Sequence, residues 1–92
     1  MTKADLVLEI HEKTGIEKVE IRSTIDEVIK TIRTTMEKGE NVYMRGFGSF
    51  IIKKRAQKLG RNISKNTTIV IPEHNVPVFK PAKEFVDEVK KL

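Results

Sequence analysis

The chain has no cysteine, no tryptophan and only two histidines among its 92 residues. Without cysteine, disulfide bonds and cysteine-ligated zinc sites are excluded. His11 and His74 have no cysteine or clustered carboxylates to join them as ligands, so we expect neither a metal site nor a cofactor. There is also no Ser-His-Asp set, phosphate-binding glycine loop or pair of carboxylates that indicates catalysis. We therefore expect that the chain is not an enzyme.

Long apolar runs are missing as well. No stretch approaches the ~20 apolar residues that a membrane-spanning helix needs. The apolar residues near the N-terminus are interrupted by Glu9, His11 and Glu12, which does not fit a secretory signal. We expect a cytoplasmic protein without a membrane partner. Hydrophobic residues make up only 38% of the chain, which gives a thin core for one small domain, and we expect that domain to fold as an oligomer.

Acidic residues are absent from residues 41–72, although 13 occur elsewhere in the chain. Outside this segment 11 basic residues face those 13 acidic ones, so the segment accounts for the net charge of +5. Soluble surfaces usually mix charges of both signs. The repulsion within a segment that carries only positive charge is reduced when a polyanion binds to it. The segment is rich in β-forming residues, and we interpret it as an ordered ribbon that binds nucleic-acid phosphates. Its basic residues are Arg45, Lys53, Lys54, Arg55, Lys58, Arg61 and Lys65.

Helices are predicted at both ends of the chain. A capping box formed by Thr2 and Asp5 predicts a first helix over residues 3–14. Apolar residues with a 3.6-residue period predict a second helix over residues 18–38. A third amphipathic helix is expected to begin at Pro81, because proline suits the first turn.

The middle of the chain has the pattern of β-strands. If Lys53 pairs near Val76, the tip of a long hairpin lies at residues 64–65, and each arm strand has about ten residues and a length of roughly 33 Å. A two-stranded ribbon of this length is marginally stable alone, so we expect a partner to order it. The predicted segments are a strand at 42–45, a tight turn at 46–48, a strand at 49–58, a polar turn at 60–68, and strands at 69–71 and 76–79.

Four motifs occur together at characteristic spacing: Arg45-Gly46-Phe47-Gly48-Ser49-Phe50, Lys53-Lys54-Arg55-Ala56, Gly60-Arg61-Asn62 and Val76-Pro77-Val78-Phe79-Lys80-Pro81. In combination they resemble the HU / integration host factor family of bacterial histone-like DNA-binding proteins, over essentially the whole chain. The resemblance implies one domain with an α+β fold, an intertwined homodimer with two protruding arms. It places the helical base at residues 1–40 and 81–92, the sheet and basic arm at 41–80, and the arm itself at about 53–76.

The resemblance also implies the ligand. Double-stranded DNA would be bound with little sequence specificity through its phosphates and minor groove, and bent and compacted in the nucleoid. Kinked, nicked or junction DNA would be preferred. Three alternatives remain open: a sequence-selective subunit like integration host factor that pairs with a paralogue, a module whose arm docks an acidic protein, and an RNA-binding protein.

The predicted DNA contacts lie mainly on the arm. The absence of balancing acids favours DNA contact over mere solubility for the arm cations, while Lys3, Lys80 and Lys83 depend mainly on the resemblance. Asn62 either forms an ordinary turn or reads minor-groove acceptors of A·T pairs. The full predicted set is Lys3, Arg45, Gly46, Gly48, Lys53, Arg55, Lys58, Arg61, Asn62, Ile63, Lys65, Asn75, Lys80 and Lys83.

Two further predictions concern apolar residues. Phe47, Phe50 and Phe79 are expected in the dimer core rather than stacked on bases. Ile63 stands where the family usually carries a proline that wedges between base pairs. Proteins that bend DNA through the minor groove use both Ile and Pro as wedges, so Ile63 is the predicted intercalating residue. The alternative is that Ile63 packs on its own ribbon.

Overall fold

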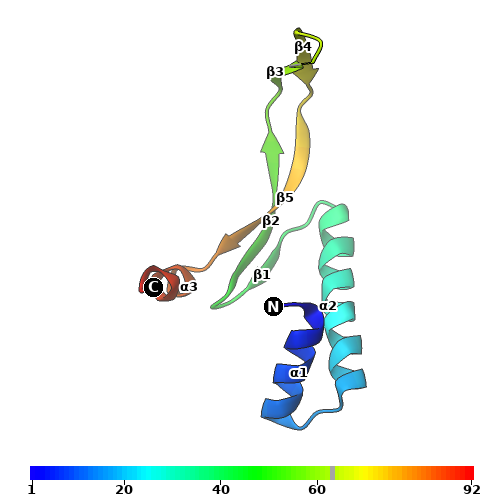
Figure 1. Cartoon of the computed structure of the whole chain (residues 1–92), viewed down its shortest axis with the longest axis vertical. Coiled ribbons are helices and arrows are strands. Elements are labelled where there is room, and N and C mark those ends of the chain that lie inside the picture. Colours follow the sequence, from blue (N-terminus) through cyan, green and yellow to red (C-terminus); the bar gives the residue numbers. More distant parts are fainter. Residues whose placement is uncertain (63) are drawn as a thin grey trace. The chain divides into compact units, whose positions relative to one another are not determined.

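The computed structural model describes residues 1–62 and 64–92 (Figure 1). The chain divides into two units, Met1–Thr34 and Thr35–Leu92, which are described separately. Three helices and five antiparallel strands confirm the predicted α+β class. The order of elements is α1 (Lys3–Thr14), α2 (Lys18–Glu37), β1 (Val42–Met44), β2 (Gly48–Arg55), β3 (Lys58–Asn62), β4 (Thr67–Ile71), β5 (His74–Pro81) and α3 (Lys83–Lys90).

The first unit contains α1 and most of α2, and the ends of α1 follow the sequence signals. Thr2 Oγ1 accepts a hydrogen bond from Asp5 N, and Asp5 Oδ2 accepts one from Thr2 N at 2.8 Å. The backbone and side-chain hydrogen bonds from Thr2 lower the pKa of the Asp5 carboxyl. Gly15 ends α1 in the left-handed region at φ 74°. Val7 and Ile21 are the buried hydrophobic residues of the described chain, so this core is small.

The second unit contains a three-stranded antiparallel sheet in the order β1-β2-β5 (Figure 1). The central strand β2 pairs with β5 from Gly48↔Pro81 to Arg55↔His74. Lys53 lies opposite Val76, which confirms the predicted pairing. The pairing extends β5 beyond the predicted residues 76–79 at both ends. Pro81 consequently ends a strand, and α3 begins only at Lys83, so the prediction that Pro81 starts the helix was wrong.

Strands β3 and β4 form a separate two-stranded ladder. The predicted polar turn at 60–68 was too long, because the strands continue to Asn62 on one side and from Thr67 on the other. Threonine has a high β-propensity, and its polarity concealed this part of the ribbon. Among the described residues, the turn is confined to residues 64–66.

The predicted continuous strand over residues 49–58 is interrupted. Residues 56–57 on one side lie opposite residues 72–73 on the other, between the pairs Arg55↔His74 and Lys58↔Ile71. Pro72 has no N–H to donate to a ladder, which accounts for an interruption at this point. Two residues are left out on each side, so the pairing register is the same before and after the break.

Four phenylalanines cluster where the sheet meets α3. The ring centroids are 4.9 Å apart for Phe47 and Phe79, 5.1 Å for Phe50 and Phe79, and 5.5 Å for Phe47 and Phe85. The sequence predicted three members of this cluster and missed Phe85. The cluster remains open to solvent, since Phe47 is 45% exposed.

The accessible surface of the chain is 7975 Å². A compact monomer of 10.6 kDa has roughly 5,500 Å² of accessible surface. The chain on its own therefore exposes far more surface than a self-contained domain.

Within the described residues, no helix has the length and apolar character needed to cross a membrane.

Candidate nucleic-acid interface

The arm carries basic side chains on both of its faces. Side chains alternate between faces along a strand, and directly paired residues share a face. Arg61 is paired with Thr68, whereas Lys58 is paired with Ile71 and lies on the opposite face. The ribbon therefore presents positive charge to two sides rather than to one flat surface.

The proximal part of the arm contains one acidic side chain. Lys54 Nζ lies 2.5 Å from Glu73 Oε1, and both side chains are more than half exposed. Among the described arm residues, this is the one ion pair formed by a basic side chain of the arm. The sequence prediction omitted Lys54 from the DNA-binding set, and its ion pair gives that basic residue a partner within the chain. Lys53 and Arg55 flank Lys54 on β2 and lie on the other face.

The tip of the arm is held together by two asparagine side chains. Asn62 Oδ1 accepts hydrogen bonds from Ser64 N at 3.2 Å, from the Ser64 hydroxyl at 2.8 Å and from Lys65 N at 3.4 Å. Asn66 has φ 54°, in the left-handed region that asparagine tolerates. Its Oδ1 accepts a hydrogen bond from the Arg61 guanidinium. These hydrogen bonds make Asn62 a turn-forming residue, which is one of the two roles that the sequence predicted for it.

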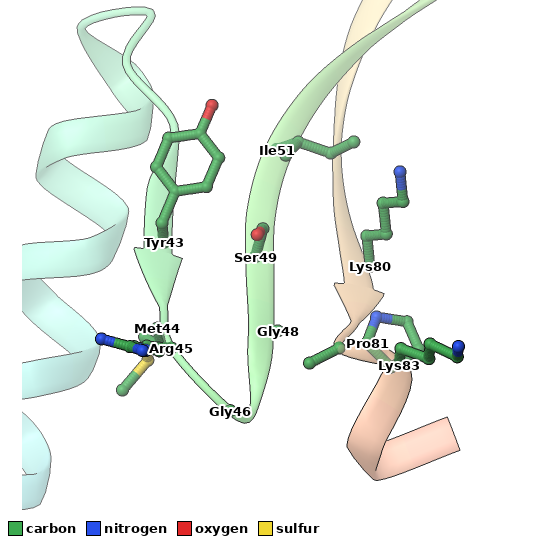
Figure 2. A pocket seen from close by; sticks show the side chains of 11 residues that line it. Tyr43, Met44, Arg45, Gly46, Gly48, Ser49, Ile51, Lys80, Pro81 and Lys83 are labelled. Carbon is green, nitrogen blue, oxygen red and sulfur yellow. The ribbon is translucent and has the colours of Figure 1, made fainter. Parts of the chain in front are cut away.

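A second group of basic residues is among those that line a concavity near the β1–β2 turn, and Figure 2 shows their side chains pointing in different directions. Lys80 and Lys83 come from the β5–α3 end of this concavity, and Arg45 comes from the β1–β2 turn. Five predicted residues are brought together here: Arg45, Gly46, Gly48, Lys80 and Lys83. Ser49 also lines the concavity, and its hydroxyl is a neutral hydrogen-bond donor. Sequence reasoning missed Ser49, although its register opposite Lys80 places it there.

Gly46 and Gly48 have different structural reasons for being glycine. Phe47 N donates to Met44 O at 3.0 Å, and Gly46 occupies the third position of that turn with φ 84°. A positive φ at this position is typical of a type II turn and favours glycine. A Cβ on Gly48 would lie 2.6 Å from Lys80 O and 2.7 Å from the Phe79 ring. Gly48 therefore allows β5 and Phe79 to approach β2 closely.

The remaining predicted residues lie elsewhere or outside the description. Lys3 belongs to the helical unit, where its Nζ lies 2.8 Å from Asp26 Oδ1. Asn75 is paired with Lys54 on the arm. Ile63 lies outside the described residues. No group of three or more potential metal ligands occurs among the residues that the structure describes.

A helical unit, a small sheet and a basic two-stranded arm define a class of proteins that bind DNA through β-ribbons. The chain matches the family model described as bacterial DNA-binding protein over residues 1–90. It is 39% identical over 90 residues to DNA-binding protein HU of Thermotoga maritima, covering 98% of this chain and all of that protein. It is 40% identical over 91 residues to DNA-binding protein HU of Clostridium pasteurianum, covering 99% and 100% respectively.

Solved structures give the same result. The Anabaena HU protein in a cocrystal with DNA has a TM-score of 0.91 at 32% identity, and the match covers 97% of each chain. HU from Thermotoga maritima has a TM-score of 0.67 at 27% identity, covering 97% of this chain and 98% of that chain. The chain belongs to the family of bacterial DNA-binding proteins, and the resemblance to HU is confirmed.

We predict that Gly48→Ala destabilises the fold more than Gly46→Ala. The added methyl group at position 48 meets backbone and an aromatic ring, and such overpacking costs about 1–3 kcal/mol. At position 46 the nearest atom to a new Cβ is the end of the flexible Glu84 side chain at 3.7 Å, so only the strain of the positive φ is added. Urea unfolding of the two variants at equal protein concentration measures the difference. Equal stability of both variants would contradict the close approach of β5 at Gly48.

Proposed function

We propose that this chain is an architectural protein of the bacterial nucleoid, which binds double-stranded DNA with little sequence specificity and bends it. The observation that carries this proposal is the β-ribbon arm with cations on both faces and a single internal ion pair. A groove of duplex DNA has phosphates along both walls, so a ribbon charged on two sides suits it better than a ribbon charged on one. The DNA-bound state of the structural neighbour from Anabaena supports duplex DNA as the ligand.

Bending follows from the dimensions of the arm. A β-layer with its side chains is about 10 Å thick, whereas the minor groove of B-DNA is about 6 Å wide. Entry of the arm therefore requires the groove to widen, which accompanies bending toward the major groove. Nicked, kinked or junction DNA deforms at lower cost, and this accounts for the proposed preference for such DNA. The basic region around Lys80 and Lys83 would bind phosphates beside the arm.

The protein is proposed to act as a homodimer. The two buried hydrophobic residues, the open phenylalanine cluster and the 7975 Å² surface all leave an isolated protomer without an adequate core. Obligate dimers bury large apolar interfaces, and such an interface would supply the core that the protomer lacks. Arrangement as a dimer would also provide two arms to clasp one duplex.

We predict that the thermal midpoint rises with protein concentration, because dissociation and unfolding are linked in an obligate dimer. Differential scanning calorimetry over a hundredfold range of concentration measures the rise, and sedimentation equilibrium gives the mass. A monomeric mass together with a constant midpoint would refute the proposed assembly.

We predict that DNA affinity falls steeply with salt and that Lys58→Gln reduces the slope. The slope of log affinity against log salt is about −0.9 for each phosphate neutralised, so removal of one contact on each arm changes it by about two per dimer. Lys30→Gln in α2 is the matched control, since Lys30 is not assigned to the interface. Fluorescence anisotropy with a linear duplex, repeated with heparin as competitor, separates duplex binding from general attraction to polyanions. An unchanged slope in Lys58→Gln would show that the arm is not the binding surface.

We predict that Ile63→Ala impairs bending more than binding. The basis is the position of Ile63 in the sequence, where the family carries its wedge, and an intruding apolar side chain offsets part of an unstacking cost of a few kcal/mol. Closure of short DNA fragments into circles should become less efficient, while affinity for linear duplex changes little. Ile63→Pro should keep both properties. Circularisation by Ile63→Ala at the parent's efficiency would assign the bend to phosphate neutralisation alone.

A further inference from the structure

The distal ladder of the arm carries two exposed aliphatic side chains that lie side by side. Leu59 in β3 is directly paired with Val70 in β4, so both side chains belong to the same face of the ribbon. Leu59 is 70% exposed and Val70 is 55% exposed. Arg61, two residues further along β3, lies on this face as well. We call Leu59 and Val70 the aliphatic pair of the arm.

On the opposite face of the ladder, one aliphatic side chain finds cover within the ribbon itself. Ile71 is half-buried, and its Cδ1 lies 3.3 Å from the position that a Cβ on Gly60 would occupy. Ile71 therefore packs into the space that Gly60 leaves open. The aliphatic pair has no such space beside it, and most of its surface stays in contact with water.

The strand conformation does not require these two residue types. Threonine has the branched shape that suits a strand, and Thr67 and Thr68 use it in β4. Leucine is not among the residues enriched in strands, yet it stands at the more exposed position of the pair. Two adjacent aliphatic side chains on a basic ribbon therefore point to a partner outside the chain that presents an apolar surface.

The position of the pair identifies the chemistry of that partner. The pair lies in the segment that is proposed to enter the minor groove, and Arg61 on the same face suits the phosphates of the groove wall. The sugars form that wall together with the phosphates, and the 2′ position of each sugar faces the minor groove. In DNA this position carries only hydrogen, so the sugar offers an apolar surface that aliphatic side chains can contact.

RNA differs from DNA at this same position. The 2′-hydroxyl of RNA is both a donor and an acceptor, and aliphatic side chains can satisfy neither role. A hydroxyl that loses water without gaining a hydrogen bond weakens binding. We propose that the aliphatic pair of the arm discriminates against the 2′-hydroxyl, so that the protein selects DNA over RNA-containing duplexes whatever their base sequence.

This inference rests on the proposed function, because it requires the arm to enter the minor groove. It goes further by naming the residues that select the sugar, whereas the basic side chains contact phosphates that DNA and RNA share. It also opposes the RNA-binding alternative that the sequence left open.

The experiment compares three duplexes of one sequence and length: all DNA, DNA with ribonucleotides at regular intervals in both strands, and DNA with 2′-fluoro nucleotides at the same positions. The hydroxyl and the fluorine favour the same sugar pucker, but only the hydroxyl has an O–H group, so their comparison separates chemistry from helix shape. In anisotropy titrations of the full chain at one salt concentration, the ribonucleotide duplex should bind more weakly than the 2′-fluoro duplex by about fivefold or more.

Leu59→Thr combined with Val70→Thr is the decisive variant. Threonine keeps the preference for a strand and supplies a hydroxyl that can hydrogen-bond to the 2′-hydroxyl. The two substituted duplexes should then bind within about twofold of each other. Val70→Thr alone changes the shape of the side chain least and should lower the ratio in part. Val19→Thr is the matched control at a 74% exposed aliphatic residue of α2, and it should keep the ratio of the parent. Because each ratio is taken within one variant, a general loss of affinity does not alter it.

The outcomes separate the inference from the function on which it rests. Equal binding of the parent to the ribonucleotide and 2′-fluoro duplexes would overturn the discrimination while leaving duplex binding intact. A parent ratio that survives in both threonine variants would assign it to another part of the protein. If the parent has no such ratio and the double variant instead loses an association between dimers in sedimentation, the pair is a contact between copies of the chain. Failure of the parent to bind the all-DNA duplex would refute the proposed function itself.

Discussion

The ladder between β2 and β5 is the interaction on which the rest of the second unit depends. It is eight residue pairs long, and it is the only long-range pairing that connects the sheet to the arm in the described chain. Register in a β-ladder decides which face each side chain occupies. A slip by one residue would exchange the faces of Lys53 and Lys54 and separate Phe50 from Phe79. The close approach at Gly48 and the pairing of Phe50 with Phe79 both favour the observed register.

Much of this architecture could be predicted because its signals are local. The capping residues of α1, the 3.6-residue period of α2 and the glycine-rich turn each follow from a few neighbouring residues. The pairing of Lys53 with Val76 was also predictable, since a hairpin has only one partner strand. The resemblance of four spaced motifs to HU then supplied the ligand, which local patterns alone could only narrow to a polyanion.

The parts that escaped prediction depend on contacts between distant residues. Pro81 carries the signal of a helix start, but pairing with Gly48 keeps it in the sheet. Thr67 and Thr68 look like turn residues until a partner strand extends past them. Ser49 has no signal of its own and joins the basic concavity only through its pairing with Lys80.

The break between the two ladders gives the arm two levels of stability. Backbone hydrogen bonds of β3 and β4 are not continuous with those of β2 and β5, because residues 56–57 and 72–73 contribute to neither ladder. Cooperative opening tends to follow contiguous hydrogen-bonded units. The distal ladder can therefore fray and re-form while the proximal sheet and its aromatic cluster stay intact. If the arm binds DNA as proposed, its end is free to adjust to the duplex while its root stays paired, so that capture of DNA does not wait for the whole arm to order at once.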